Sequence, residues 1–247
     1  MKNWFISLLI LVIATSVKAQ VKFITAGKIE FEKKFNQFAM YDKEDLESNW
    51  MKDMMKNFPK VLSDVYVLDF NEDKSVYKLG KENTDNKYLW GRKPSTDDII
   101  VKDLKNSSIK IQRDVYEETF LIEDSLRNCE WKITNETRKI AGFECKKAVT
   151  KICDSVYVVA FYTDEIMVSS GPESFGNLPG MILGLAVPRL NTTWFATKVE
   201  IIEPAPQQLS PKQKGKKVNW TQYNVSLGKA MKDWGKYGSK VIWTSLL

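Results

Sequence analysis

Residues 65–79 (VYVLDFNEDKSVYKL) indicate the fold class of this chain. Within them, residues 65–70 alternate between two faces, the polar run 71–74 follows, and residues 76–79 resume the alternation. A period of two is typical of a β strand, and a short polar run between two such segments predicts a hairpin. Further stretches with strand character lie at residues 29–35, 109–111, 115–122, 131–134, 141–150, 156–162 and 194–202. Short strands joined by polar turns predict a mainly β (α+β) chain built on a single antiparallel sheet.

Helical spacing is found in two segments. Lys43–Asn57 carries apolar residues three or four positions apart, and Pro59 ends it. Ser226–Trp234 begins with a serine cap and is ended by Gly235. We therefore expect one or two helices beside the sheet. Because the sequence shows no internal repeat and no second hydrophobic core, we expect one domain.

Histidine is absent from the sequence. Its absence excludes Ser-His-Asp and Cys-His catalysis, His-ligated metal sites and the usual proton shuttle near neutral pH. The 37 Lys and Arg residues against 31 Asp and Glu give a formal net charge of +6. This excess is spread thinly along the chain, so we expect no binding to nucleic acid. The 43% of apolar residues is enough to build a core.

The N-terminus has the pattern of a secretory signal peptide. Lys2 precedes an apolar run at residues 4–14, and Val17-Lys18-Ala19 forms a cleavage site of the A-x-A type. The apolar run is shorter than the roughly 20 residues that span a bilayer, and no later window is apolar enough to do so. We expect a signal peptide at residues 1–19 and a mature domain at residues 20–247, exported to the periplasm, the outer membrane or the medium.

Three cysteines, Cys129, Cys145 and Cys153, would meet oxidising conditions after export. Cys129 and Cys145 are equidistant from Thr137, so they face each other if residues 135–139 form a hairpin loop. Cys145 with Cys153 is the rival disulfide, and three reduced cysteines packed as small hydrophobic residues are the alternative. The odd number leaves at least one thiol unpaired within the chain. The spacing matches no metal-binding motif, and we expect neither a metal nor a cofactor.

The segment Gly171–Leu185 (GPESFGNLPGMILGL) has the densest concentration of turn residues. Proline followed by glycine at residues 179–180 suits the two central positions of a type II turn. Gly171 and Pro172 predict another turn, and Asn177 tolerates a left-handed backbone. The candidate motif residues are Gly171, Pro172, Phe175, Asn177, Leu178, Pro179, Gly180, Met181 and Ile182. We expect the turns to hold the apolar members of this set beside the sheet.

Three other groups of residues have a functional interpretation and a simpler one. Methionines within residues 51–55 could bind Cu(I), but this spacing is also that of a helix face packed on a core. Acidic residues at 42–45, 72–73 and 97–98 could serve in acid–base catalysis, although neighbouring acids in turns are usually solvated. The basic run Lys212–Lys217 could bind by charge and stacking, or be an ordinary loop. We favour the simpler interpretation for each group and assign no catalytic residue.

Residues 177–182 resemble the hexapeptide Gly-Leu-Pro-Gly-Leu-Ile of the GLPGLI family, exported proteins of Bacteroidetes-type bacteria. Asn177 stands for the first glycine and Met181 for the second leucine. Residues 131–148 resemble the family's tryptophan and its I-x-G-aromatic-x-C-x-K-A block, and residues 161–166 resemble its aromatic-Tyr-Thr-x-x-Ile block. The resemblance covers most of the mature chain and implies no established activity.

The sequence favours a non-enzymatic envelope protein that binds an apolar ligand or a protein partner. By analogy with the half-barrel lipoprotein carriers, its single sheet would curve around an apolar cavity. One alternative is a hydrolase-type enzyme that uses carboxylates or a free cysteine thiol. A second alternative is a structural component of an outer-membrane assembly.

Overall fold

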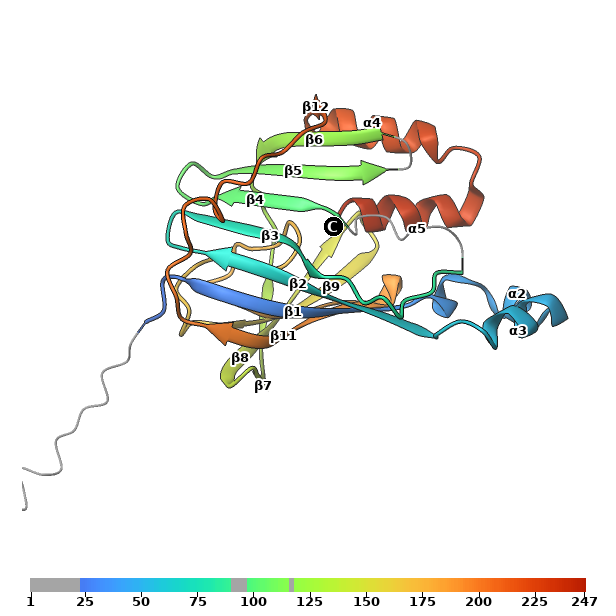
Figure 1. The fold of residues 1–247 in the computed structure, drawn as a ribbon, viewed down its shortest axis with the longest axis horizontal. Helices are drawn as coiled ribbons and strands as arrows, with labels where there is room; N and C mark the ends of the chain where they lie inside the picture. The colour runs from blue at the N-terminus through green and yellow to red at the C-terminus, as the bar shows by residue number, and fades with distance from the viewer. Residues whose placement is uncertain (1–22, 90–96, 116–117) are drawn as a thin grey trace, which may run out of the picture.

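The computed structural model describes residues 23–89, 97–115 and 118–247 (Figure 1). The predicted signal peptide and its cleavage site lie outside these residues. The strands are β1 Gly27–Asn36, β2 Val61–Phe70, β3 Lys74–Lys81, β4 Ile99–Asp103, β5 Ser108–Val115, β6 Glu118–Ser125, β7 Lys132–Ile140, β8 Phe143–Ile152, β9 Val156–Thr163, β10 Met181–Val187, β11 Thr192–Glu200 and β12 Lys216–Val218. The helices are α2 Lys43–Glu47, α3 Asn49–Met55, α4 Trp220–Ala230 and α5 Gly235–Ser245, with 3₁₀ turns at Phe38–Met40 and Pro188–Leu190.

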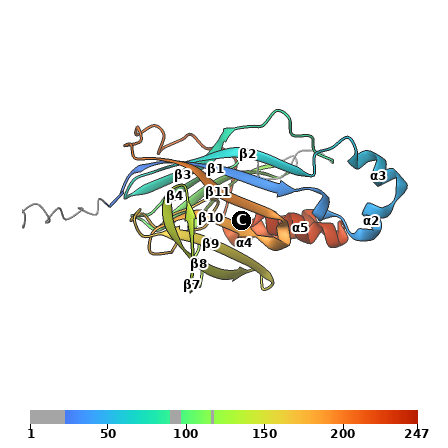
Figure 2. The ribbon, with the colours of Figure 1, turned by 90° about the horizontal axis from the view of Figure 1, so that it is seen from below.

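All of these strands belong to one 12-stranded sheet in the order β12-β6-β5-β4-β3-β2-β1-β11-β10-β9-β8-β7. Neighbouring strands are antiparallel except β12, which pairs with β6 in parallel. Figure 2 shows β7, β8 and β9 turned out of the layer that β1, β2 and β11 form. Gly184 on β10 permits the close approach of Ile140 and Phe195, since a Cβ added there would lie 2.9 Å from the side chain of each. The mainly β fold with a single curved sheet is as the sequence predicted.

The hairpin predicted at residues 65–79 is confirmed as β2 and β3. Leu68 pairs with Tyr77 in its register, and both side chains are buried. In the turn, the Asn71 side-chain oxygen accepts hydrogen bonds from the backbone N–H groups of Asp73 and Lys74, at 3.1 and 2.9 Å. The asparagine therefore closes the turn with its own side chain.

Two strand boundaries differ from the prediction. Residues 135–139 belong to strand β7, and the turn to β8 lies at Ala141 and Gly142, with φ angles of +48° and +94°. Two successive positive φ angles are typical of the tight type I′ hairpin, which needs no polar loop. The stretch 115–122, predicted as one strand, is divided between β5 and β6.

The helices are more numerous and more divided than predicted. Ser48 splits the stretch 43–57, because it ends α2 in an extended conformation and caps α3 by accepting a hydrogen bond from the Met51 N–H. The second predicted helix is α4, which starts earlier than predicted at an Asn219 cap. Helix α5 was not predicted. Across the described residues, no helix is long and apolar enough to cross a membrane.

The space enclosed by the curved sheet is filled by the chain itself. The segment that precedes β10 and the end of the chain meet there, where the Ser174 N–H donates to the Leu247 carbonyl at 3.0 Å. Figure 1 shows the chain end in the middle of the molecule, beside the start of β9 and the end of α5. Phe175 and Leu178 of the preceding segment are buried in the same core as the strand residues. The interior is therefore a packed core.

Candidate functional site

The turns of the Gly171–Leu185 segment have the backbone conformations that glycine and asparagine favour. Asn177 has φ +61° and Gly180 has φ +142°. A Cβ on Gly180 would lie 2.0 Å from the Thr163 carbonyl oxygen, so only glycine fits there. The turn at residues 179–180 lacks the closing hydrogen bond of a type II turn, because the Gly180 N–H donates to the Leu178 carbonyl and the Met181 N–H donates to the Ile166 carbonyl.

The apolar motif residues pack inward. Phe175, Leu178, Met181 and Ile182 are all buried. The Trp131 ring packs edge-on against Phe175, with centroids 6.3 Å apart, and its indole N–H donates to the Gly176 carbonyl at 2.9 Å. The other predicted motif residues divide between the interior and the surface. Gly171, Pro172 and Gly180 are buried, whereas Asn177 and Pro179 are exposed.

A buried carboxylate in the same segment pairs with a lysine of the sheet. Glu173 is 1% exposed and has φ +53°, a conformation that is uncommon for a residue with a side chain. Its Oε1 accepts hydrogen bonds from Lys33 Nζ at 2.7 Å and from the Trp194 indole N–H at 3.1 Å. Lys33 also lies 4.9 Å from the Tyr66 ring centroid and 5.1 Å from that of Trp194. The lysine on β1 therefore holds the segment against the sheet.

A second ion pair lies beside the first. Arg113 Nε donates to Asp98 Oδ2 at 2.5 Å, and Arg113 Nη2 lies 3.8 Å from Glu173 Oε2. Burial raises the pKa of Asp98 to about 6, even though the neighbouring Arg113 acts to lower it. Arg113 also donates to the Ser245 carbonyl, which ties β5 to the end of α5.

Lys102 on β4 donates hydrogen bonds to two backbone carbonyls of the Gly171–Leu185 segment. Its Nζ donates to Gly171 O at 2.7 Å and to Phe175 O at 2.5 Å, and the residue is 2% exposed. Burial lowers the pKa of this amine to about 7. We call Lys33, Asp98, Lys102, Arg113 and Glu173 the buried ionic cluster. It fixes the Gly171–Leu185 segment from three strands, and its side chains are shielded from solvent.

The alternation of buried positions along the strands indicates where the cations of the buried ionic cluster lie, although charged residues are not usually expected in a core. Each of the three cations stands at a position of its strand that faces the core. Lys33 follows Phe31, Lys102 follows Ile100, and Arg113 follows Ile111, each at a spacing of two. For Asp98 the sequence favours a solvated turn acid over a catalytic one, whereas its side chain is buried against Arg113. Glu173 could not be recognised, because its cationic partners Lys33 and Arg113 lie more than 50 residues away along the chain.

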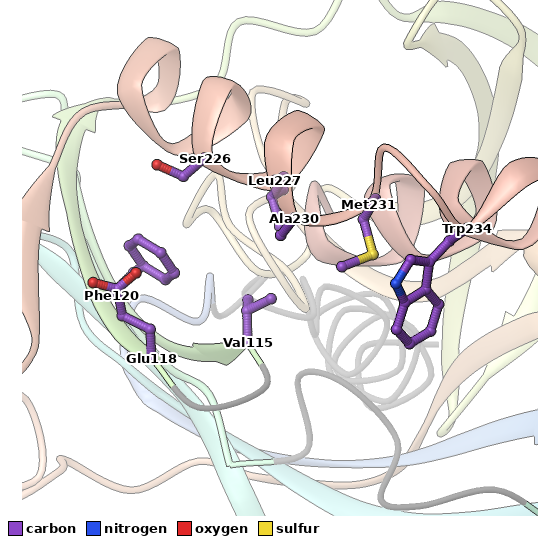
Figure 3. A pocket seen from close by; sticks show the side chains of 8 residues that line it. All are labelled: Val115, Glu118, Phe120, Ser226, Leu227, Ala230, Met231 and Trp234. Carbon is purple, nitrogen blue, oxygen red and sulfur yellow. The ribbon is translucent and has the colours of Figure 1, made fainter.

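An apolar concavity lies away from the motif, between α4 and the adjoining ends of β5 and β6 (Figure 3). We call it the α4 groove. Its volume is about 280 Å³, and its lining residues are Val115, Glu118, Phe120, Ser226, Leu227, Ala230, Met231 and Trp234. The apolar floor is buried, whereas Trp234 at the rim is 47% exposed. Glu118, the acidic residue in the lining, is paired with Lys216 at 2.8 Å.

Comparison with known families identifies the chain. Residues 68–224, more than half of the chain, match the family described as "N-glycanase peptide, N-terminal domain". The chain belongs to this family. No curated protein matches it.

Two solved structures of PNGF-II resemble the fold. In the C2 crystal form the TM-score is 0.52 at 20% identity, with 90% of this chain and 33% of that chain covered. In the P2₁ form the TM-score is 0.51 at 21% identity, with 81% and 32% covered. At this identity the likeness shows a shared fold. The chain spans about a third of the length of these structures.

The region that matches the family model holds most of the buried ionic cluster. Asp98, Lys102, Arg113 and Glu173 lie within residues 68–224, whereas Lys33 lies on β1, outside them. Helix α5 also lies outside the match. The family model therefore covers the motif and its anchors on β4 and β5.

The three cysteines of the domain are free thiols. The predicted Cys129–Cys145 disulfide is not formed, because residues 135–139 are strand and place Arg138 opposite Cys145. Burial raises the pKa of the Cys145 thiol to about 12 and also raises that of Cys129. Cys153 lies in the turn between β8 and β9 and is exposed.

The remaining sequence candidates have local structural roles. Met51 packs inward, and Met54 and Met55 are half-buried. Asp42 and Asp45 form a capping box at the start of α2. Within the described residues, no group of three His, Cys, Asp or Glu side chains is arranged to hold a metal.

Proposed function

We propose that this domain is an exported, non-enzymatic binding module whose α4 groove accepts an apolar side chain of a protein partner. The observation that carries the proposal is a partly open concavity with an apolar floor. Its floor residues are nearly buried, and the exposed Trp234 stands at its rim. Aromatic residues beside small apolar pockets often dominate the binding energy of protein interfaces.

The size of the groove favours a side chain over a whole ligand. Its volume of about 280 Å³ lies just below the range of roughly 300–1,000 Å³ for small-molecule sites. The motif residues Phe175, Leu178 and Met181 are packed in the core, so the apolar ligand that the carrier analogy implied has no support beside them.

The comparisons favour a protein partner. In the two PNGF-II structures, about two thirds of the chain lies outside the region that matches this domain. A domain of this fold is thus found next to further protein in those chains. We infer that the present domain contacts a separate protein in an analogous manner.

The hydrolase alternative has less support. The two groups with strongly displaced pKa values that an acid–base mechanism would use, Asp98 and Lys102, are buried and bonded to the chain. A catalytic group must reach its substrate directly or through one water molecule. The free thiol of Cys153 is exposed, but burial effects raise its pKa, which disfavours a nucleophilic thiolate at neutral pH.

Location in the periplasm or at the outer membrane is part of the proposal. It is supported by the signal-peptide pattern at residues 1–19 and by the GLPGLI resemblance at residues 177–182. Cell fractionation under gentle and harsh detergent distinguishes a free periplasmic protein from a component of an outer-membrane assembly.

Site-specific photo-crosslinking in the producing cell tests the groove. A photo-reactive residue at position 226 lies in the groove, and one at position 224 lies on another face of α4, because two positions differ by about 200° around a helix. We expect a single adduct of defined mass from position 226 and none from position 224. Ala230→Trp should fill the groove and abolish the adduct, while Asn224→Trp should leave it intact. Equal adducts from both positions, or none from position 226, would refute the proposal.

A further inference from the structure

A second concavity lies on the opposite face of the sheet from the core. It has a volume of about 330 Å³ and is bounded by the strands β3 to β6 and by the loop that precedes β12. Its lining residues are Lys74, Val101, Asp103, Ser108, Lys110, Leu121, Leu209, Ser210, Pro211 and Gln213. We call it the loop pocket. The proposed function does not use it.

The wall of the loop pocket is fixed to the sheet. The Gln213 side-chain amide donates to the Ile99 carbonyl at 2.8 Å, and the Lys214 N–H donates to Gln112 Oε1 at 2.9 Å. Gly215, with φ +136°, lies so close to β6 that a Cβ would approach the Thr119 carbonyl oxygen to 2.8 Å. The basic run that the sequence suggested as an ordinary loop is therefore a positioned wall.

The loop pocket has a positive surplus of charge. Lys74 and Lys110 line it, and Lys212 and Lys214 are exposed on its wall. Lys110 is paired with Glu123 at 3.0 Å. No ion pair between described residues includes Lys212 or Lys214, and Lys74 lies opposite Asp103 in the β3–β4 register and contributes to lowering the pKa of that carboxyl. A surplus of cations around a concave surface attracts anionic groups.

The pocket also contains an acceptor, which a simple anion would not use. Asp103 accepts hydrogen bonds from the Asn106 backbone and side chain at 2.9 and 3.0 Å, and these bonds hold the pKa of its carboxyl below the usual range. An ionised carboxylate only accepts hydrogen bonds, so its ligand must donate them. The hydroxyls of Ser108 and Ser210 add groups that donate and accept.

We propose that the loop pocket binds an acidic sugar, a ring that carries hydroxyl groups and a carboxylate. The carboxylate pairs with Lys74, and ring hydroxyls donate to Asp103. The C–H face of the ring packs on the apolar floor formed by Val101, Leu121 and Leu209. An acidic peptide would satisfy the lysines but would bring few donors for Asp103.

Calorimetric titration of the full chain with three defined probes tests this site. The probes are the trimer of galacturonic acid, the neutral trimer of galactose, and triglutamate, which carries the same number of side-chain carboxylates as the first. We expect the first probe to bind at low salt and the other two to bind at least tenfold more weakly. Binding should weaken as salt screens the charges.

Matched variants locate the binding. Lys74→Gln should weaken binding of the galacturonic acid trimer at least tenfold, and Lys110→Gln should weaken it as well. Lys151→Gln removes the same charge from an exposed position on β8 and should have no effect. Thermal unfolding confirms that each variant is folded. Equal binding of triglutamate, binding of the neutral trimer, or an effect of Lys151→Gln equal to that of Lys74→Gln would overturn the assignment. So would absence of binding by the galacturonic acid trimer.

Discussion

Lys33 and Glu173 form an ion pair of 2.7 Å in the core, although 140 residues separate them in the sequence. Both side chains are nearly inaccessible to solvent. The pair joins β1 to the segment that leads into β10, so it contributes to the relative placement of two parts of the chain. Removal of Glu173 would leave Lys33 as an unpaired charge in the core, which is costly, whereas removal of Lys33 would leave Glu173 with Arg113 at 3.8 Å.

We predict that Glu173→Gln lowers the free energy of unfolding by about 3–5 kcal/mol. Lys33→Met should cost less, because Arg113 remains 3.8 Å from Glu173; both losses are measured by urea denaturation. The double variant should lose less than the sum of the two single losses, because Lys33 is then not left as an unpaired charge. Additive losses would show that the ion pair is not a coupled unit.

Asp98 should make the free energy of unfolding decrease as the pH rises from about 4 to 6. Its pKa is raised to about 6 in the folded chain from 3.8, so the folded chain holds this proton more tightly than the unfolded chain. Its contribution is therefore greatest below pH 3.8 and falls as the pH rises to about 6. We expect the difference in unfolding free energy between the wild type and Asp98→Asn to decrease by roughly 2–3 kcal/mol between pH 4 and 7. A constant difference would contradict this assignment.

Lys102 should make the free energy of unfolding increase with pH in the alkaline range. Its pKa is lowered to about 7 from 10.5, so the unfolded chain binds the proton more tightly over that interval. Stability from this group therefore rises with pH above 7. The difference between the wild type and Lys102→Met should grow by about 2 kcal/mol between pH 7 and 9 in urea titrations. Lys151→Met, at an exposed position, is the control and should give a flat difference.

The sheet could be predicted from the sequence because its signals are local. The hairpin at residues 65–79 combines a period of two with Asn71, whose side chain closes the turn. Helix α5 could not be predicted in the same way. It contains Gly235 and Gly238, which disfavour helix, and it is stabilised by tertiary contacts such as the Tyr237 hydroxyl bond to Asp45 at 2.5 Å.

The candidate site was predicted only in part. The conformations of Asn177 and Gly180 follow from residue type, since these residues tolerate positive φ. The buried ionic cluster depends on pairs such as Arg113 with Glu173, which only the folded chain brings together. Charged residues are rarely buried unless paired, so composition argues against burial until the partner is known.

The cysteines give a prediction about reactivity. In the folded chain we expect Cys153 alone to react with a maleimide, because it is exposed while Cys129 and Cys145 are buried. Mass spectrometry should show one modification under native conditions and three in denaturant. A protected Cys153, or rapid reaction of Cys145, would contradict the structure. A disulfide in protein isolated from the cell envelope would do the same.

Gly180 gives the sharpest test of the motif. Gly180→Ala would place a methyl group 2.0 Å from the Thr163 carbonyl oxygen, on a backbone with φ +142° that alanine rarely adopts. The backbone strain alone is of the order of 1–3 kcal/mol, and the steric conflict adds to it. We therefore expect a loss of about 3 kcal/mol or more in urea denaturation. Gly228→Ala is the matched control, because its added Cβ in α4 would have no atom within 4 Å apart from its chain neighbours and the backbone of its own helix. Alanine in the middle of a helix is favoured over glycine, so this variant should gain about 0.5–1 kcal/mol. Equal effects of the two substitutions would show that the turn at residues 179–180 does not need glycine.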